Sequence, residues 1–136
     1  MDNCSICANA PEALLAENQH AKLLLFHAPQ VPGHVIVAAK EHVRLYHELS
    51  DETIVAIARL TSSATLKVKT ALGCDRYYLA SIGDRDFHFH FHILPHNDSN
   101  PPLGPFVFGE KGWSSTRAGE DMDQAATKLR RIYERE

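Results

Sequence analysis

The sequence predicts an α+β domain in which antiparallel strands pack against one long helix. Residues 21–26 and 34–39 are short apolar runs joined by a loop with two prolines and a glycine, which is typical of two paired strands. Between Ser50 and Gly73, apolar side chains recur at helical spacing. Residues 88–92 read His-Phe-His-Phe-His, and such strict alternation favours a strand.

The helical segments have recognisable ends. Residues 8–17 are expected to form one or two helical turns. The long helix begins with a Ser50 cap followed by two acids, and it ends at Gly73, a residue type that favours helix ends. Its inward face is predicted to consist of Ile54, Ile57, Ala58, Thr61, Ala64, Thr65, Val68 and Leu72.

The second half of the chain begins with a hairpin. Residues 76–82 predict a third strand, and the Gly-Asp-Arg-Asp turn at 83–86 leads into the histidine strand. Residues 97–120 are rich in turn-forming residues and are expected to form a long loop packed over the sheet. Residues 121–136 predict a C-terminal helix.

Composition and charge exclude several classes of protein. With 136 residues, 44% hydrophobic and 23% charged, the chain suits one domain spanning residues 1–136. A net charge of −3 provides no basic field that would attract nucleic acid or an anionic membrane. The N-terminus lacks the charged start and apolar run of a signal peptide, so we expect a cytoplasmic protein. We also expect that it binds neither nucleic acid nor a membrane.

The three alternate histidines, His88, His90 and His92, share one face of their strand and are called the histidine row below. The apolar face carries Phe87, Phe89, Phe91 and Ile93. Alternate residues on a strand stand roughly 6.6 to 6.8 Å apart, which separates the two ends of the row by roughly 13 Å. One metal ion cannot bind all three rings, so the row predicts separate roles for its members.

The cysteines predict no disulfide framework. Their number is odd, and no export signal precedes them. Cys4 and Cys7 form a CxxC pair that is either part of a zinc site, with ligands from among His34, His42 and His88, or an unliganded terminus. Cys74, at the helix end, is expected to be a small buried residue.

Two motifs resemble the histidine triad (HIT) family. Residues 88–94 match its His-φ-His-φ-His-φ-φ pattern, where φ is apolar, and residues 32–42 match its Pro-Gly-His strand with a Lys-x-His end. The segment 72–81 is similar to the bacterial HIT-like, diadenosine tetraphosphate hydrolase-like branch. The resemblance implies a five-stranded antiparallel half-barrel sheet with a long helix and a C-terminal helix. Its core would span about 4–96, and the protein would form a homodimer.

The resemblance also implies an activity. Members of the family hydrolyse or transfer nucleotides at the α-phosphate through a covalent nucleotidyl-histidine, which assigns the nucleophile to His90. A neutral imidazole is abundant at pH 7 and can attack phosphorus. His92 would contact the phosphate oxygens and leaving group. His34 would lie beneath these two as a supporting histidine.

The same resemblance implies a structural zinc site. In many bacterial members the first triad histidine joins two N-terminal cysteines and the Lys-x-His histidine, which here are His88, Cys4, Cys7 and His42. Such a Cys₂His₂ set forms a closed tetrahedral site. The competing interpretation is a metal-free His88 that only orients its neighbours by hydrogen bonds.

Substrate contacts are expected at three further positions. Arg85 lies in the turn before the row, where relatives often place Gln or Ser, and is either a phosphate ligand or a solvated turn residue. Phe26 occupies the family's ribose-binding position and would line a base pocket or belong to the core. His96 could contact substrate, although an exposed loop position is preferred. His20, His27 and His47 match no motif and are expected at ordinary surface or loop positions.

The sequence therefore predicts a hydrolase or nucleotidyl transferase that cleaves nucleotide conjugates, such as dinucleoside polyphosphates or adenylylated small molecules, at the α-phosphate. The alternative is a HIT-fold module that binds nucleotide or phosphate without efficient chemistry. The changed turn at 83–87 and the apolar residue at position 26 are the features that keep this alternative open.

Overall fold

The computed structural model describes residues 4–84, 86–97 and 119–135, and over these residues it has the α+β architecture that was predicted. The described strands form one five-stranded antiparallel sheet in the order β1-β2-β3-β5-β4. The strands are β1 Leu14–Glu17, β2 Ala21–Leu25, β3 Val35–Ala39, β4 Arg76–Ala80 and β5 His90–His96. The helices are α1 Asp51–Leu72 and α3 Gly119–Glu134, with 3-10 turns η1 Pro11–Ala13 and η2 Tyr46–Glu48.

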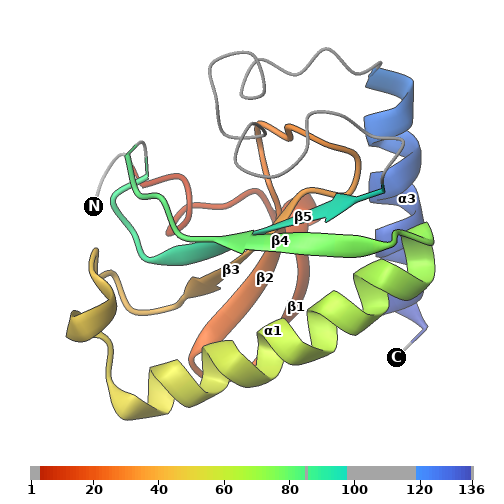
Figure 1. Cartoon of the computed structure of the whole chain (residues 1–136). Coiled ribbons are helices and arrows are strands. Elements are labelled where there is room, and N and C mark those ends of the chain that lie inside the picture. Colours follow the sequence, from red (N-terminus) through yellow and green to blue (C-terminus); the bar gives the residue numbers. More distant parts are fainter. Residues whose placement is uncertain (1–3, 85, 98–118, 136) are drawn as a thin grey trace.

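Helix α1 lies along one face of this sheet, and α3 stands beside the C-terminal end of α1 (Figure 1). The hairpin of β4 and β5 forms as predicted, with Tyr78 opposite Leu94. Within the part of the chain that the structure describes, no helix combines the length and apolar character that crossing a membrane requires. The predicted loop at 97–120 lies almost entirely outside the described residues.

Helix α1 begins and ends where the sequence indicated. The hydroxyl of Ser50 accepts a hydrogen bond from the backbone N–H of Thr53 at 3.2 Å, and Gly73 closes the helix in the left-handed conformation with φ of 65°. The buried face is Thr53, Ala56, Ile57, Leu60, Ala64, Thr65 and Val68. The prediction was wrong at Ala58, which is exposed, because the stripe that meets the sheet starts at Thr53.

The predicted helix at residues 8–17 is wrong for most of its length. Only Pro11–Ala13 forms a 3-10 turn, and Leu14–Glu17 is strand β1, with Glu17 opposite Lys22 of β2. Proline suits the first position of a helix, but a single turn closes few hydrogen bonds. The otherwise free edge of β2 offers a ladder of backbone partners to the same residues, and this pairing outweighs local propensity.

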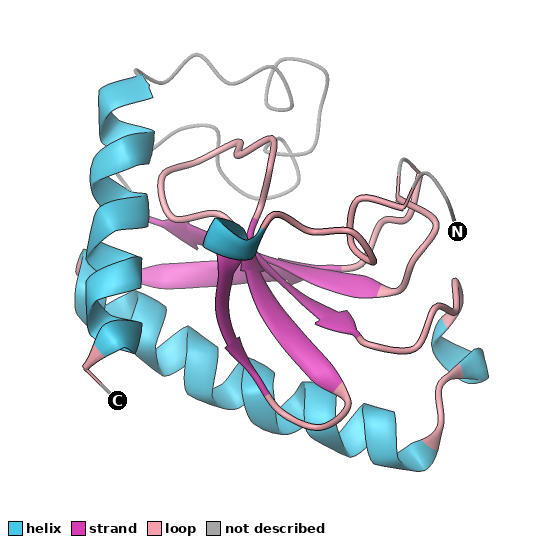
Figure 2. Ribbon diagram, turned by 180° about the vertical axis from the view of Figure 1, so that it is seen from behind, coloured by secondary structure: helices cyan, strands magenta, loops and turns pink. Residues whose placement is uncertain are grey.

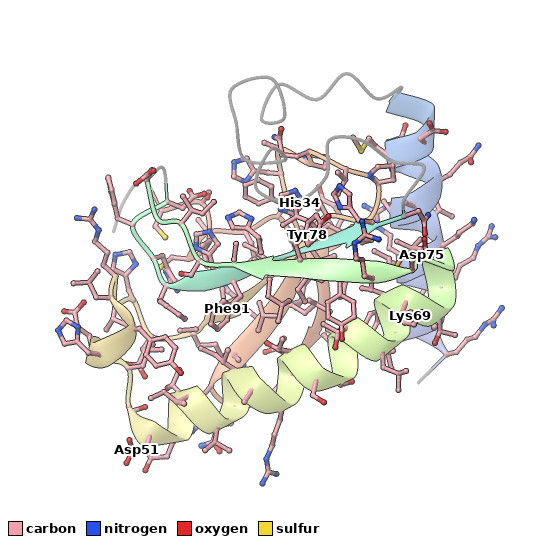
Figure 3. All side chains as sticks on the ribbon, viewed as in Figure 1. His34, Asp51, Lys69, Asp75, Tyr78 and Phe91 are labelled. Atoms are coloured by element: carbon pink, nitrogen blue, oxygen red, sulfur yellow. The ribbon has the colours of Figure 1, made fainter. Side chains whose placement is uncertain are left out.

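The sheet has two buried faces of different chemistry. Phe89, Phe91 and Ile93 pack with the α1 face, together with Val35 and Val37 of β3. Figure 3 shows Phe91 on the side of α1 and His34 on the opposite side of the strands. Phe87 does not share this face, since β5 begins only at His90. Its ring is 54% exposed beneath the guanidinium of Arg44.

Gly33 places the next residue, His34, at the start of β3. Its φ of 83° favours glycine, and a Cβ built there would meet Leu72 Cδ1 at 2.2 Å and Pro95 Cγ at 3.3 Å. The chain can therefore pass between the end of α1 and β5 only without a side chain at this position. This close approach brings His34 against the histidine row.

Candidate functional site

The histidine face of the sheet, defined here as the face that carries His90 and His92, is built by strand register. Ile36 of β3 lies opposite His92 and Ala38 lies opposite His90, while Leu24 of β2 lies opposite Ile36. Directly opposed residues on paired strands share a face. Small or apolar neighbours therefore surround both rings, and each is only 3% exposed.

The four histidines of this region form one directed chain of hydrogen bonds. The backbone N–H of Gln30 donates to His34 Nδ1 at 3.1 Å, so a neutral His34 carries its proton on Nε2. That nitrogen lies 2.8 Å from His92 Nδ1, and His92 Nε2 lies 3.1 Å from His90 Nε2. His90 Nδ1 lies 2.6 Å from the carbonyl oxygen of His88, which can only accept. One assignment of protons satisfies every link, with all donors pointing from Gln30 towards His88.

This assignment leaves an unprotonated nitrogen on His90. Because Nδ1 must donate to the His88 carbonyl, the lone pair of a neutral His90 lies on Nε2 and accepts from His92. Burial, followed by the neighbouring charges of His92 and His90, lowers the pKa of His34 well below its ordinary value. Burial likewise lowers the pKa of His92 to about 3. The two supporting rings are therefore neutral at pH 7.

His88 turns its side chain away from this chain. Its Nε2 donates to the carbonyl of Ala39 at 2.5 Å, which directs Nδ1 towards Cys4 and Cys7, each with Sγ at 3.4 Å. His42 Nδ1 lies 3.1 Å from His88 Nδ1 and 3.2 Å from Cys7 Sγ. The ligand atoms of these four residues all lie within 4.8 Å of one another. The structure thus brings together the set that the resemblance implied.

The geometry of the cluster fits a tetrahedral zinc ion. Bonds of about 2.0 to 2.1 Å to nitrogen and 2.3 Å to sulfur require separations of about 3.3 Å between nitrogens and about 3.5 Å between nitrogen and sulfur. The four separations given above for single pairs of ligand atoms are within a few tenths of an ångström of these values. Burial lowers the pKa of His88 and keeps the ring neutral, as metal binding requires.

The four members of the cluster come from three segments of the chain. Ile6 is 2% exposed, and its carbonyl accepts from Lys22 Nζ at 2.7 Å, which anchors the turn between the two cysteines. His42 follows Glu41, whose carboxylate accepts from the hydroxyls of Ser50 and Thr53 at the start of α1. The cluster therefore ties the N-terminus, α1 and the approach to β5 together.

Two cavities lie at the histidine face, and one of them is lined by members of the row. The Phe26 cavity, about 520 Å³, is lined by residues that include Leu24, Phe26 and Ile36 of the histidine face. Phe26 is 8% exposed, and its ring centroid lies 4.5 Å from that of His34 and 5.0 Å from that of His92. The position is therefore both core and pocket wall.

The second cavity, named here the Arg44 cavity, has a volume of about 350 Å³. It is lined by His88 and His90 together with Arg44, Leu45, Tyr46, Phe89 and residues 81–84. A reacting group bound over His90 would therefore have space on the side of the Arg44 cavity. Sequence reasoning missed Arg44 and Tyr46, because nothing in their local pattern places the turn at η2 beside the histidine row.

Several further expectations can be compared with the structure. His96 is fully buried in β5 and stacks on Tyr78 with ring centroids 4.5 Å apart, so the preferred exposed loop position was wrong. The strand continues through Pro95 because β4 pairs along it. His27 lies at an exposed loop position as expected, and it also lines the Phe26 cavity. Cys74 is buried as expected. Arg85 lies outside the described residues.

The neutral state of His92 predicts a pH dependence of stability. Unfolding returns the ring to an ordinary pKa of 6.5. Below that pH the unfolded chain binds a proton that the folded chain does not bind, and this lowers the free energy of unfolding. The free energy of unfolding is therefore unaffected by His92 protonation above pH 6.5. Between pH 6.5 and 3 it falls by about 1.4 kcal/mol for each pH unit. Urea denaturation at pH 7, 6 and 5 should show a smaller fall for His92→Asn than for the parent. Equal slopes would contradict the assigned neutral ring.

The comparison with known proteins agrees with this geometry. The family model described as HIT domain matches residues 8–99. The adenosine 5'-monophosphoramidase of Schizosaccharomyces pombe is 33% identical over 122 residues, which cover 83% of this chain and 84% of that protein.

Two solved structures share the fold. A zinc-bound histidine triad protein of Mycobacterium smegmatis has a TM-score of 0.75 at 20% identity, covering 98% of this chain and 95% of that one. The diadenosine triphosphate hydrolase of Plasmodium falciparum has a TM-score of 0.70 at 16% identity, covering 93% and 80%. The match of the family model to residues 8–99 and the 33% identity to the Schizosaccharomyces pombe relative show that the chain belongs to the histidine triad family.

Proposed function

We propose that this protein is a hydrolase or nucleotidyl transferase that cleaves nucleotide conjugates at the α-phosphate, with His90 as the nucleophile. The observation that carries the proposal is the hydrogen-bond chain ending at the His88 carbonyl, which leaves the lone pair of His90 on Nε2. A nucleophilic imidazole needs one unprotonated nitrogen and a second nitrogen that holds the ring in place. His90 meets both requirements.

The reaction would proceed in two displacements. His90 Nε2 attacks the α-phosphorus, a P–N bond forms, and the bond from phosphorus to the leaving group breaks. Water, or another acceptor, then attacks the phosphorus and returns the electron pair to Nε2. Splitting one difficult displacement into two easier ones is the advantage of covalent catalysis.

His92 would change partner during the first step. Its Nε2–H points at His90 Nε2 in the resting protein, so attack requires this donor to release the nucleophile. The nearest alternative acceptors would be the oxygens of the bound phosphate. A preorganised donor that meets developing negative charge stabilises the transition state. His34 would hold His92 in the donating tautomer throughout.

The two cavities suit a substrate with two arms. An aromatic base would lie on the apolar floor of the Phe26 cavity, and the leaving group would occupy the Arg44 cavity. The relative in Schizosaccharomyces pombe is an adenosine 5'-monophosphoramidase, and the fold neighbour in Plasmodium falciparum is a diadenosine triphosphate hydrolase. Both names support nucleotide conjugates as the substrate class.

Substitution of the proposed nucleophile tests this function. His90→Ala should lower kcat on an adenosine phosphoramidate or a dinucleoside polyphosphate by about a thousandfold or more, because the covalent route is lost. His47→Ala, at an exposed residue of η2 that borders neither cavity, is the matched control and should keep parental turnover. Turnover by His90→Ala at the parental rate would remove the proposal.

The rival function, a module that binds nucleotide without chemistry, makes a different prediction for the same experiment. Rapid acid quenching during turnover, followed by mass spectrometry, should find a nucleoside monophosphate attached to the peptide that carries His90. A binding module would show nucleotide affinity with neither turnover nor an adduct.

We further propose that Cys4, Cys7, His42 and His88 hold a structural zinc ion. The support comes from the fit of the four ligand atoms to a tetrahedral ion and from the zinc-bound fold neighbour in Mycobacterium smegmatis. When bound, zinc would cross-link the segments that carry its ligands, and a closed set of four protein ligands leaves no position for substrate. Burial and the adjacent Cys4 raise the pKa of the Cys7 thiol, so binding would release protons.

Metal analysis tests the zinc site. Purified protein should contain about one zinc per chain, and Cys7→Ser should lose most of it together with about 5 °C or more of melting temperature. Cys74→Ala is the control, because this buried cysteine is not among the four residues of the cluster and should leave the zinc content unchanged. Parental protein without zinc, or a Cys7→Ser variant of parental heat stability, would contradict the site.

Homodimer formation stays a prediction. Strand β4 is an edge of the described sheet, paired only with β5, and it exposes Tyr77 at 36% and Leu79 at 49%. A second copy could pair with this edge and cover both side chains. Sedimentation equilibrium should find a dimer that Leu79→Lys dissociates, whereas a monomeric parent would contradict it.

A further inference from the structure

The Phe26 cavity has charged side chains at its rim that form no salt bridge among the described residues. Its floor is apolar, formed by Ile6, Leu24, Phe26 and Ile36, which belong to one buried cluster on the histidine face. The rim is completed from two other elements, the 3-10 turn η1 and helix α3. Figure 2 shows this turn in front of the strands, with α3 on the same side of the molecule.

Most polar side chains of the rim are already paired within the protein. The Ser5 hydroxyl donates to Asp86 Oδ1 at 2.7 Å. Asn9 uses both ends of its amide, because Oδ1 accepts from Lys22 Nζ at 2.6 Å and Nδ2 donates to the carbonyl of Ala10 at 3.1 Å. These residues shape the cavity, but their pairing leaves them poor candidates for reading a ligand.

Two charged side chains of opposite sign remain. Glu12, from η1, and Arg130, from α3, both line the cavity, and both are exposed. Among the described residues neither takes part in a salt bridge, with each other or with a third residue; the ion pair found there joins Lys40 and Glu17. The cavity thus offers a pure acceptor and a pure donor over one apolar floor.

We propose that Glu12 and Arg130 select guanine as the base bound in the Phe26 cavity. This inference rests on the proposed function, because it names the nucleotide that the same site would take. Guanine carries two donors, N1–H and the N2 amino group, on one edge and two acceptors, O6 and N7, on another. The carboxylate of Glu12 would accept from the first edge, and the guanidinium of Arg130 would donate to the second.

Adenine presents the wrong pattern to the same pair. Its N1 is an acceptor and would face the carboxylate, while its 6-amino group is a donor and would face the guanidinium. Arginine reads O6 and N7 of guanine in nucleic acids for this reason. A partly exposed site weakens each contact, so we expect a preference of about tenfold for guanine.

Binding of the monophosphates tests the selection without depending on turnover. Calorimetric titration of the parent with GMP and AMP should give a Kd for GMP about tenfold lower. Glu12→Gln and Arg130→Met should each bring the two Kd values towards equality. Arg131→Met is the matched control, since this neighbour on α3 is exposed but does not line the cavity, and it should keep the preference.

Turnover separates this inference from the proposed function. Guanosine and adenosine 5'-phosphoramidates should both be hydrolysed by the parent, with kcat/KM higher for the guanosine compound. Three results would overturn guanine selection while leaving the proposed function intact. They are equal kcat/KM for the two phosphoramidates, equal Kd values for GMP and AMP, and a loss of preference in Arg131→Met as large as in Glu12→Gln or Arg130→Met. If neither compound is hydrolysed and neither nucleotide binds, the proposed function fails and the selection fails with it.

Discussion

The hydrogen bond from His90 Nδ1 to the carbonyl of His88 is the contact on which the rest of the site depends. At 2.6 Å it fixes which nitrogen of His90 carries the proton, and every link back to Gln30 follows from that choice. The residue that supplies the carbonyl also aims its own ring at Cys4 and Cys7. A single residue therefore joins the proposed zinc site to the proposed nucleophile, through its side chain on one side and its backbone on the other.

The sheet separates these roles by placing packing on one face and chemistry on the other. The α1 face is closed by aliphatic and aromatic side chains such as Val37 and Ile93, whose burial stabilises the fold. On the histidine face, each buried ring nitrogen of His34 and His92 has a partner, so burial adds rigidity instead of an unsatisfied group. The low pKa of His92 is a consequence of the same burial.

The local sequence pattern was enough to predict those helices and strands whose hydrophobic periodicity repeats over many residues. The long helix has a cap, an apolar stripe and a terminal glycine, and its observed bounds, Asp51–Leu72, follow them. The histidine strand has strict alternation. Strand β1 has four residues and no such repeat, so only the edge of β2 decides its conformation. His96 was misplaced for a related reason, because only pairing with β4 extends the strand as far as this residue.

The sequence by itself determined which chemical groups this protein possesses: alternate imidazoles, a CxxC pair and a second histidine strand, with spacing that gives each ring its face. It could not determine distances between residues far apart in the chain. Only folding brings Cys7 into contact with His88, which lies 81 positions away. Only folding places Glu12 and Arg130 at the rim of the same cavity. The physical reason is that alternation along a strand is a local steric property, whereas a ligand cluster or a pocket rim needs the register of several elements at once.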